Sequence, residues 1–299
     1  SWKTIWDRSG DLADADYDRA YTSQRAFAID HQHPDRLLVG IRGVWETKNA
    51  SAATPTWKAI SGPLSAAADH PYISALAIAP SDSQIVYVAS ADGHLWVTED
   101  GGAHWHKRDS GLAGTVIDIR VHPTDAYGVL AVTGWGPGVW ALDKSGSSWQ
   151  WNTIAGDLPN TLSAGTIHGD WRHHPARYLV GTTSGVWCSS DLGAHWTEFG
   201  THLPHTNVTD LEAAGPILYA GTFGRSVWAI RLRPAKDPTP TIGPFVSGPA
   251  HVGPGDPVEH LPVLGQPADL LMLPGRLPGQ PLPLVEERKQ DAPVEETKA

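Results

Sequence analysis

Residues 73–107 decide the fold: Ile73-Ser-Ala-Leu-Ala-Ile-Ala-Pro80, Ile85-Val-Tyr-Val-Ala-Ser90, His94-Leu-Trp-Val-Thr98 and His104-Trp-His-Lys107. Each run is apolar or alternating and is bounded by Gly, Pro, Asp or Ser, as expected for short β-strands joined by tight turns. Strands connected by such short turns pair antiparallel. The stretch therefore predicts one four-stranded antiparallel sheet.

The tryptophan of the third run recurs along the chain. A small or apolar residue followed by Trp is found at Trp45, Trp96, Trp140, Trp187 and Trp228. By subtraction, these tryptophans are 51, 44, 47 and 41 residues apart, close to the ~40–45 residues of a four-stranded propeller blade. The composition, with 14 Trp, 31 Gly and only 18% charged residues, also favours many short strands. We predict an all-β, five-bladed β-propeller over residues 1–233.

A second tryptophan marks the outer strand of each predicted blade. These outer tryptophans are Trp57, Trp105, Trp149 and Trp196, and no tryptophan follows Trp228. The run Ser1-Trp-Lys-Thr-Ile5 resembles Thr56-Trp-Lys-Ala-Ile60, so we expect the N-terminal strand to complete the last blade and close the ring. The alternative is an arc of a six- to eight-bladed ring. The division of one blade between the two ends of the propeller favours closure.

Residues 234–299 have a different composition, because they hold 14 of the 25 prolines and show neither helical nor alternating periodicity. Such a segment cannot form a core of its own. Its apolar side chains nevertheless favour burial, and its Pro-x-x-Pro spacing favours a polyproline II conformation. We predict an extended arm that docks onto other protein subunits through Leu270, Leu271, Leu273, Leu282 and Leu284.

Charge and cysteine content exclude several functions. The net charge is -10, and no basic run exceeds Arg288-Lys289, which argues against binding to nucleic acid or an anionic membrane. No apolar stretch approaches the ~20 residues of a membrane span. The single Cys188 excludes an intrachain disulfide and is expected to be buried. A chain starting at Ser1 fits a processed, extracytoplasmic protein, although a trimmed chain would also start in this way.

Two of the predicted turns share a stricter pattern. Thr98-Glu-Asp-Gly-Gly-Ala-His-Trp105 and Ser189-Ser-Asp-Leu-Gly-Ala-His-Trp196 both read Ser/Thr-x-Asp-x-Gly-x-x-Trp. This pattern resembles the Asp-box, or BNR, repeat of sialidase-like, sortilin-like, xyloglucan-degrading and photosystem-assembly-factor-like propellers. The resemblance covers the propeller only and implies its fold. In those families the Asp-box is structural, so a structural role is expected for Thr98, Asp100, Gly102, Trp105, Ser189, Asp191, Gly193 and Trp196.

Ligand binding in a propeller is expected on the face that carries the turns between second and third strands. The candidate binding residues on this face are Asp16, Asp18, Arg19, Arg42, Tyr72, Trp135 and Arg225. Asp16 and Asp18 could act as a glycosidase acid/base pair, or could simply belong to a solvated acidic loop. Most of the 15 His occupy repeat positions, so no metal or cofactor is predicted.

These observations favour a non-catalytic binding or assembly subunit of a larger extracytoplasmic complex, with a glycan as a further candidate ligand. We therefore predict that the protein is not an enzyme. The Arg-Ile-Pro element that a sialidase would carry near its N-terminus is absent, and the chain is shorter than the two-domain xyloglucan enzymes. The alternative function is a glycan-active hydrolase or a carbohydrate-binding propeller.

Overall fold

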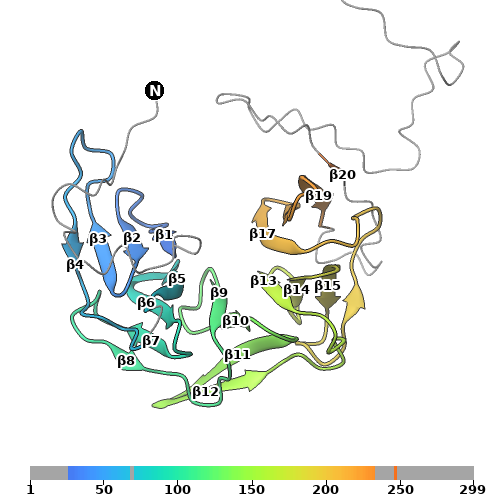
Figure 1. Cartoon of the computed structure of the whole chain (residues 1–299), viewed down its shortest axis with the longest axis horizontal. Helices are drawn as coiled ribbons and strands as arrows, with labels where there is room; N and C mark the ends of the chain where they lie inside the picture. The colour runs from blue at the N-terminus through green and yellow to red at the C-terminus, as the bar shows by residue number, and fades with distance from the viewer. Residues whose placement is uncertain (1–25, 68–70, 233–245, 248–299) are drawn as a thin grey trace, which may run out of the picture. The chain divides into compact units, whose positions relative to one another are not determined.

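The computed structural model describes residues 26–67, 71–232 and 246–247, all of which lie in the first of two compact units, residues 1–259. These residues form five four-stranded antiparallel sheets, and every regular element among them is a strand (Figure 1). The described ranges contain no helix long and apolar enough to cross a membrane. The prediction of an all-β fold is confirmed.

In each sheet the strands follow one another in chain order. The first sheet contains β1 (Phe27–Ile29), β2 (Leu37–Gly40), β3 (Val44–Thr47) and β4 (Lys58–Ala59). The second contains β5 (Ile73–Ala79), β6 (Asp82–Ser90), β7 (Leu95–Thr98) and β8 (His106–Lys107). The third contains β9 (Val116–Val121), β10 (Val129–Thr133), β11 (Gly138–Ser145) and β12 (Ser148–Thr153). The fourth contains β13 (Ala164–Asp170), β14 (Arg177–Thr182), β15 (Gly185–Ser189) and β16 (Thr197–Glu198). The fifth contains β17 (Val208–Ala214), β18 (Ile217–Thr222), β19 (Val227–Arg231) and β20 (Val246–Ser247).

The tryptophan repeat sets one common register in all five sheets. The third-strand residues Trp45, Trp96, Trp140, Trp187 and Trp228 lie opposite Val39, Val88, Ala131, Val180 and Ala220 of the second strands. Those residues lie opposite Phe27, Leu76, Ile119, Ile167 and Leu211 of the first strands, which we call the inner positions. Equivalent residues of the repeat can therefore be compared directly.

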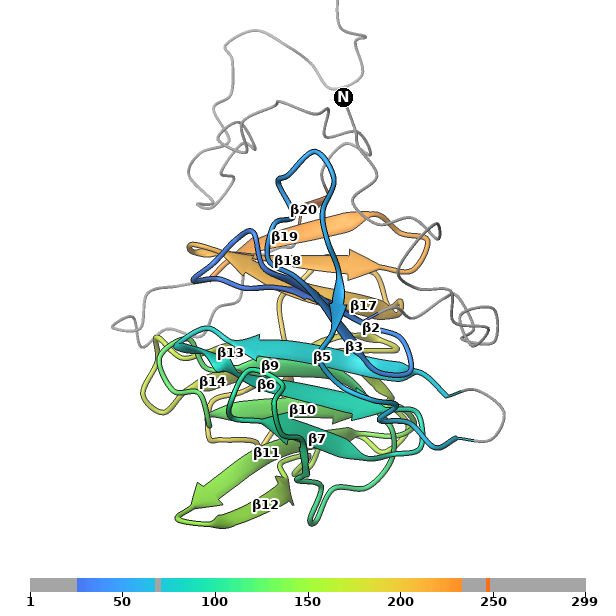
Figure 2. The same cartoon turned by 90° about the vertical axis from the view of Figure 1, so that its left-hand side faces the viewer.

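Neighbouring sheets pack through apolar clusters. Val44 of the first sheet shares a cluster with Ile78 of the second, and Tyr87 of the second shares one with Ile119 of the third. Matching clusters join the third sheet to the fourth and the fourth to the fifth. Strands β5, β9 and β13 accordingly lie side by side (Figure 2).

Tryptophan side chains on or near the outer strands add polar links between sheets. The indole nitrogens of Trp105, Trp151 and Trp196 donate to the carbonyls of Ile60, Arg108 and Ile154 at 3.0, 2.8 and 3.0 Å, each carbonyl belonging to the preceding sheet. In the third sheet this bond comes from Trp151, two residues beyond the outer tryptophan expected from the sequence. Trp149 instead packs edge-on against Tyr127, with their ring centroids 5.6 Å apart.

The two Ser/Thr-x-Asp-x-Gly-x-x-Trp turns have the same hydrogen bonds. In the second of them, Ser189 Oγ donates to Asp191 Oδ1 at 2.8 Å and accepts from the backbone of Gly193 at 2.8 Å. Asp191 Oδ1 also accepts from the backbone of His195 at 2.9 Å. Gly193 has a φ of 92°, which a residue with a Cβ atom rarely adopts. The Asp side chain therefore closes the turn that presents Trp196.

The edge of the last sheet differs from the sequence prediction. Residues Val246 and Ser247 of β20 pair with Ala229 and Trp228, the place predicted for the N-terminal strand. An unpaired β19 edge would leave backbone N–H and C=O groups without partners, and these two residues pair with it. The segment 234–299, predicted to lack secondary structure, thus contains one short strand. Residues 1–6 and the predicted docking leucines lie outside the described residues.

The charge on Asp191 gives its turn a pH-dependent stability. Hydrogen bonds from the backbone and side chain of His195 and from Ser189 lower the pKa of Asp191 to about 2, against roughly 3.9 in an unfolded chain. The stabilisation is complete above roughly pH 4 and is lost as the pH falls through about 2. Urea midpoints of wild type and Asp191→Asn should therefore differ at pH 5 and converge towards pH 2. A difference that stays constant over this range would contradict the assignment.

Candidate active site

A central hollow of about 530 Å³ is bordered by residues from all five sheets. Its wall contains the first strands β5, β9 and β13, the start of β17, and Phe27 at the start of β1. Side chains alternate between the two faces of a strand, so polar residues interspersed in these strands can face the hollow while apolar ones pack between sheets. The run Val116-Ile-Asp-Ile-Arg-Val121 of β9 shows this alternation.

Asp118 is held firmly in the wall of the hollow. Its Oδ2 atom accepts hydrogen bonds from Thr166 Oγ1 at 2.8 Å, from the backbone nitrogen of Ile167 at 3.0 Å and from Arg120 Nε at 3.3 Å. Two of these donors belong to the neighbouring sheet, on β13. Asp118 therefore links the third and fourth sheets and has little freedom to move.

Arg120 connects β9 to β17, two sheets further along the chain. Its Nη1 atom donates to Glu212 Oε2 at 2.7 Å, and its Nη2 atom donates to Asp210 Oδ1 and to the carbonyl of Leu211, both at 3.1 Å. The side chains of Asp210 and Glu212 are 66% and 62% exposed, against 25% for Arg120. The guanidinium thus fixes two carboxylates that remain open to solvent.

The charges around Arg120 also affect its neighbours. Burial would lower the pKa of Arg120, but the carboxylates of Asp118, Glu212 and Asp210 outweigh this effect and raise it. His168, on β13, has its pKa lowered by burial and by the positive charge of Arg120. The site therefore combines a fixed cation and three carboxylates with a histidine that is uncharged at neutral pH.

One hydroxyl in the wall has no partner among the described residues. Ser74 of β5 is 8% exposed, and its Oγ atom, although buried, forms no hydrogen bond within those residues. Ser74 also borders the central hollow. A buried hydroxyl without a partner costs ~1–3 kcal/mol. This oxygen is therefore an unsatisfied polar group in the wall of the hollow.

The candidate binding residues named from the sequence are not gathered in the central hollow. Trp135 is 94% exposed in the turn after β10, with a left-handed φ of 74°. Arg225 is exposed in the turn after β18, and its carbonyl accepts the Trp228 indole N–H at 2.7 Å. Arg42 and Tyr72 are half-buried, and neither borders the hollow. Asp16, Asp18 and Arg19 lie outside the described residues.

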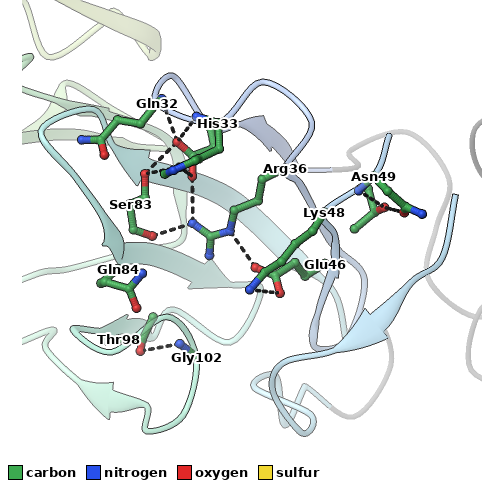
Figure 3. Close-up of polar contacts among 12 residues, drawn as sticks. Gln32, His33, Arg36, Glu46, Lys48, Asn49, Ser83, Gln84, Thr98 and Gly102 are labelled. Carbon is green, nitrogen blue, oxygen red and sulfur yellow. Dashed lines mark hydrogen bonds and ion pairs between the residues drawn. The ribbon is translucent and has the colours of Figure 1, made fainter. Parts of the chain in front are cut away.

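A larger hollow of about 910 Å³ lies between the first and second sheets, but its buried groups satisfy one another (Figure 3). Arg36 donates from Nε to Glu46 at 2.6 Å and from Nη1 to Asp30 at 3.0 Å and the Ser83 carbonyl at 2.5 Å. Burial would raise the pKa of Asp30, but hydrogen bonds from Ser83 and Arg36 lower it to about 2. We assign this cluster a structural role.

The buried charges of this cluster were not among the residues predicted from the sequence. Neither were most of the charged residues around the central hollow. A signal was present in the repeat. Arg36 lies directly before the apolar second strand β2, and Arg177 begins β14. Each pairs with an aspartate at or just after the end of the first strand, Asp30 or Asp170. Asp118, Arg120 and Glu212 alternate with apolar residues in first strands. Among the described residues, no group of three His, Cys, Asp or Glu side chains is arranged to hold a metal.

Comparison with known proteins relates the chain to glycan-degrading enzymes. No family model matches it. It is 26% identical to a xyloglucanase of Hypocrea jecorina (strain QM6a) over 251 residues, which cover 73% of this chain and 26% of the relative. It is also 26% identical to a Paenibacillus sp xyloglucanase over 218 residues, which cover 67% of this chain and 19% of the relative. The chain thus spans about a quarter or less of these proteins.

Solved structures establish the propeller fold. An ancestral GH74 enzyme superposes with a TM-score of 0.54 at 17% identity, covering 72% of this chain and 31% of the enzyme. The β-propeller domain of Cps50 (Swd1) from Myceliophteria thermophila superposes with a TM-score of 0.56 at 12% identity, covering 74% of this chain and 70% of that domain. The prediction of a β-propeller is therefore confirmed.

The predicted function needs correction. Both curated relatives are named xyloglucanase, which contradicts the predictions of a non-catalytic assembly subunit and of a protein that is not an enzyme. The two relatives favour the alternative prediction, a glycan-active hydrolase. A structural role for the Asp-box turns does not exclude catalysis by polar residues on the first strands.

Removing the cation of the cluster between the first two sheets should lower the free energy of unfolding. Arg36→Met removes the cation and leaves Asp30 and Glu46 buried without it, which costs about 3–5 kcal/mol in comparable buried pairs. We expect a matching fall in the free energy of unfolding measured in urea. The control Arg231→Met, at an exposed position, should change it by less than about 0.5 kcal/mol. Equal effects of the two substitutions would show that the cluster does not stabilise the fold.

Proposed function

We propose that this chain is the β-propeller part of a glycan-active hydrolase and that the central hollow is its substrate site. The observation that carries the proposal is the convergence of Asp118, Asp210 and Glu212 on Arg120 beside the central hollow. Hydrolysis of a glycosidic bond uses two carboxyl groups, one to protonate the leaving oxygen and one to activate water or attack the sugar. Asp118 and Asp210 border the hollow, and Glu212 is bonded to the same guanidinium as Asp210.

The hydrogen bonds of the three carboxylates suggest a division of roles. Asp118 accepts three hydrogen bonds, and we assign it to holding the wall and orienting Arg120. Asp210 and Glu212 are two residues apart on β17, so they project from the same face of the strand. Both are exposed to solvent. We assign proton transfer to Asp210 and Glu212, with Arg120 as the residue that positions them.

The substrate we propose is a polysaccharide of the xyloglucan type. Its hydroxyl groups match the hydroxyl of Ser74 and the polar side chains of Asn207 and Thr209 that border the hollow. Trp135 offers an exposed ring on which a sugar could stack. The two Ser/Thr-x-Asp-x-Gly-x-x-Trp turns support membership of the Asp-box superfamily, and a polysaccharide substrate of this kind supports an extracytoplasmic location.

Substituting the two exposed carboxylates tests the proposed function. Asp210→Asn and Glu212→Gln keep the shape of each side chain but remove its acid/base chemistry, so kcat should fall by about 10²–10⁴-fold. Release of reducing ends from xyloglucan, mixed-linkage glucan and xylan measures activity, and calorimetry measures binding. The control Asp143→Asn changes an exposed residue of β11 and should leave both unchanged. A variant that carries both substitutions and keeps the kcat of wild type would refute the proposal. A wild-type protein that neither binds nor cleaves any of these polysaccharides would also refute it.

Ser74 provides a separate test of substrate contact. Because its buried hydroxyl has no partner among the described residues, Ser74→Ala removes an unsatisfied polar group and should leave the thermal midpoint unchanged or raise it. Loss of one hydrogen bond to substrate, worth about 0.5–1.5 kcal/mol, should raise KM about two- to tenfold with little change in kcat. A lower midpoint at unchanged KM would instead indicate a structural role for this hydroxyl.

A further inference from the structure

The larger hollow, between the first and second sheets, lies at the opposite end of these sheets from the central hollow. It is bordered by Asp30, directly after β1, by Lys48, directly after β3, and by Ser83 near the start of β6. The central hollow is bordered instead by Phe27 at the start of β1 and by Ser74 near the start of β5. Among the described residues, no side chain borders both hollows. A ligand in the larger hollow would therefore be held by residues of its own.

Arg36 brings a buried and only partly bonded cation to this hollow. Its side chain is 7% exposed, and its Nε and Nη1 atoms donate to Glu46, Asp30 and the Ser83 carbonyl. Its Nη2 atom forms no hydrogen bond to a described residue, and Figure 3 shows it pointing into the hollow, towards Gln84. A buried donor without a partner costs free energy. An acceptor placed beside this nitrogen would remove that cost.

Two further donors border the hollow. Lys48 is 73% exposed, and its ammonium lies 3.5 Å from Glu46 Oε2. The side chain of Gln84 is exposed and forms no hydrogen bond to a described residue. In Figure 3 these two side chains lie on either side of the Arg36 guanidinium. Arg36, Lys48 and Gln84 therefore form one group, which we call the donor cluster.

The carboxylates that border the hollow, by contrast, already accept hydrogen bonds. Asp30 accepts from Ser83 Oγ at 2.7 Å and from two backbone nitrogens. Asp35 accepts from the backbone and the hydroxyl of Ser51, both at 3.0 Å. Asp100 accepts from residues of its own turn. The wall therefore has more unused donors than unused acceptors, and it suits a ligand that presents acceptor oxygens.

The charge around the hollow disfavours an anion as that ligand. More carboxylates than cations border it: Asp30, Asp35 and Asp100 against Arg36 and Lys48. Glu46, which pairs with both cations, adds a further negative charge. An anion would enter a region of its own sign, where like charges repel. The acceptor oxygens are therefore expected on an uncharged ligand, and hydroxyl groups supply such oxygens.

We propose that the larger hollow is a second carbohydrate site, which binds uncharged sugar units through the donor cluster. Its volume of about 910 Å³ is in the range of small-molecule pockets, roughly 300–1,000 Å³. Sugar hydroxyl oxygens accept from the three donors, while the hydroxyl hydrogens bond to the lone pairs left on the carboxylates. The ion pairs of Arg36 with Asp30 and Glu46 hold the guanidinium in place before a ligand arrives, which limits the entropy cost of binding.

This second site binds sugar without cleaving it. Burial would raise the pKa of Asp30, but its hydrogen bonds lower it to about 2, so this carboxyl group cannot protonate a leaving oxygen at neutral pH. The site would hold a second stretch of polysaccharide on the molecule. The proposal goes beyond the function assigned to the central hollow, because sugar would bind here whether or not that hollow cleaves it.

Protection of a thiol at the rim tests whether sugar enters the larger hollow. Gln32→Cys places the thiol at an exposed position that borders the hollow, and it leaves the donor cluster intact because the Gln32 amide bonds to the Pro80 carbonyl. A neutral xyloglucan oligosaccharide at about ten times its Kd should slow labelling about tenfold. The control Asp143→Cys, on β11, should be labelled at an unchanged rate. The native Cys188 is buried and should not interfere.

Removing donors tests how the sugar is held. Lys48→Met and Gln84→Leu change exposed side chains, and each should raise the Kd measured by this protection about two- to tenfold, the effect of one hydrogen bond. The matched control Lys58→Met, at an exposed position of β4, should not change it. The variant that carries Asp210→Asn and Glu212→Gln should show the same protection as wild type, since neither side chain borders this hollow.

Three results would overturn the proposal. Protection by sodium sulfate or glucuronate, but not by the neutral oligosaccharide, would identify an anion site. Protection that keeps its full strength in both donor variants would place the sugar elsewhere. The absence of protection by any of these compounds would show that the hollow belongs to the fold alone. Each readout is a labelling rate that does not depend on cleavage, so a failure here is distinct from a failure of the proposed hydrolase function.

Discussion

Burial of both faces of each four-stranded sheet is the constraint on which the rest of this structure depends. A sheet with apolar residues on both faces needs a neighbour on each side. The residue before the repeated tryptophan packs forward, and the inner position of the next sheet packs back against it. The indole bonds from Trp105, Trp151 and Trp196 to the preceding sheet then fix the distance between sheets. Sheet spacing, register and order all follow from this contact.

The same constraint explains where polar residues can collect. Apolar side chains are required where one sheet lies against the next, but first strands also have positions that point towards the central hollow. Asp118 borders the hollow, and Arg120 lies beside it in β9, bonded to Asp118. The charged residues therefore do not replace the apolar side chains that pack between sheets. This separation allows one fold to carry a reactive centre without weakening its core.

The fold could be predicted from the sequence to a large extent, because the tryptophan spacing reports the strand pattern locally. The strand runs read from residues 73–107 agree with β5 to β8 to the residue at four of the eight ends and within three residues at the other four. The place of Trp151 and the pairing of β20 could not be predicted, since each depends on contacts with distant residues. The meeting of Arg120 with Glu212, 92 residues apart, depends on how the sheets curve, and spacing along the chain does not encode that curvature.

The exposure of the proposed acid/base pair decides how a substrate would change its surroundings. Asp210 and Glu212 lie on β17, the first strand of the last described sheet, and both are more than half exposed. A polysaccharide bound over β17 would cover these two carboxylates and exclude water from them. Excluding water in this way strengthens electrostatic interactions with a bound substrate. The substrate itself would thus complete the environment in which the two carboxylates act.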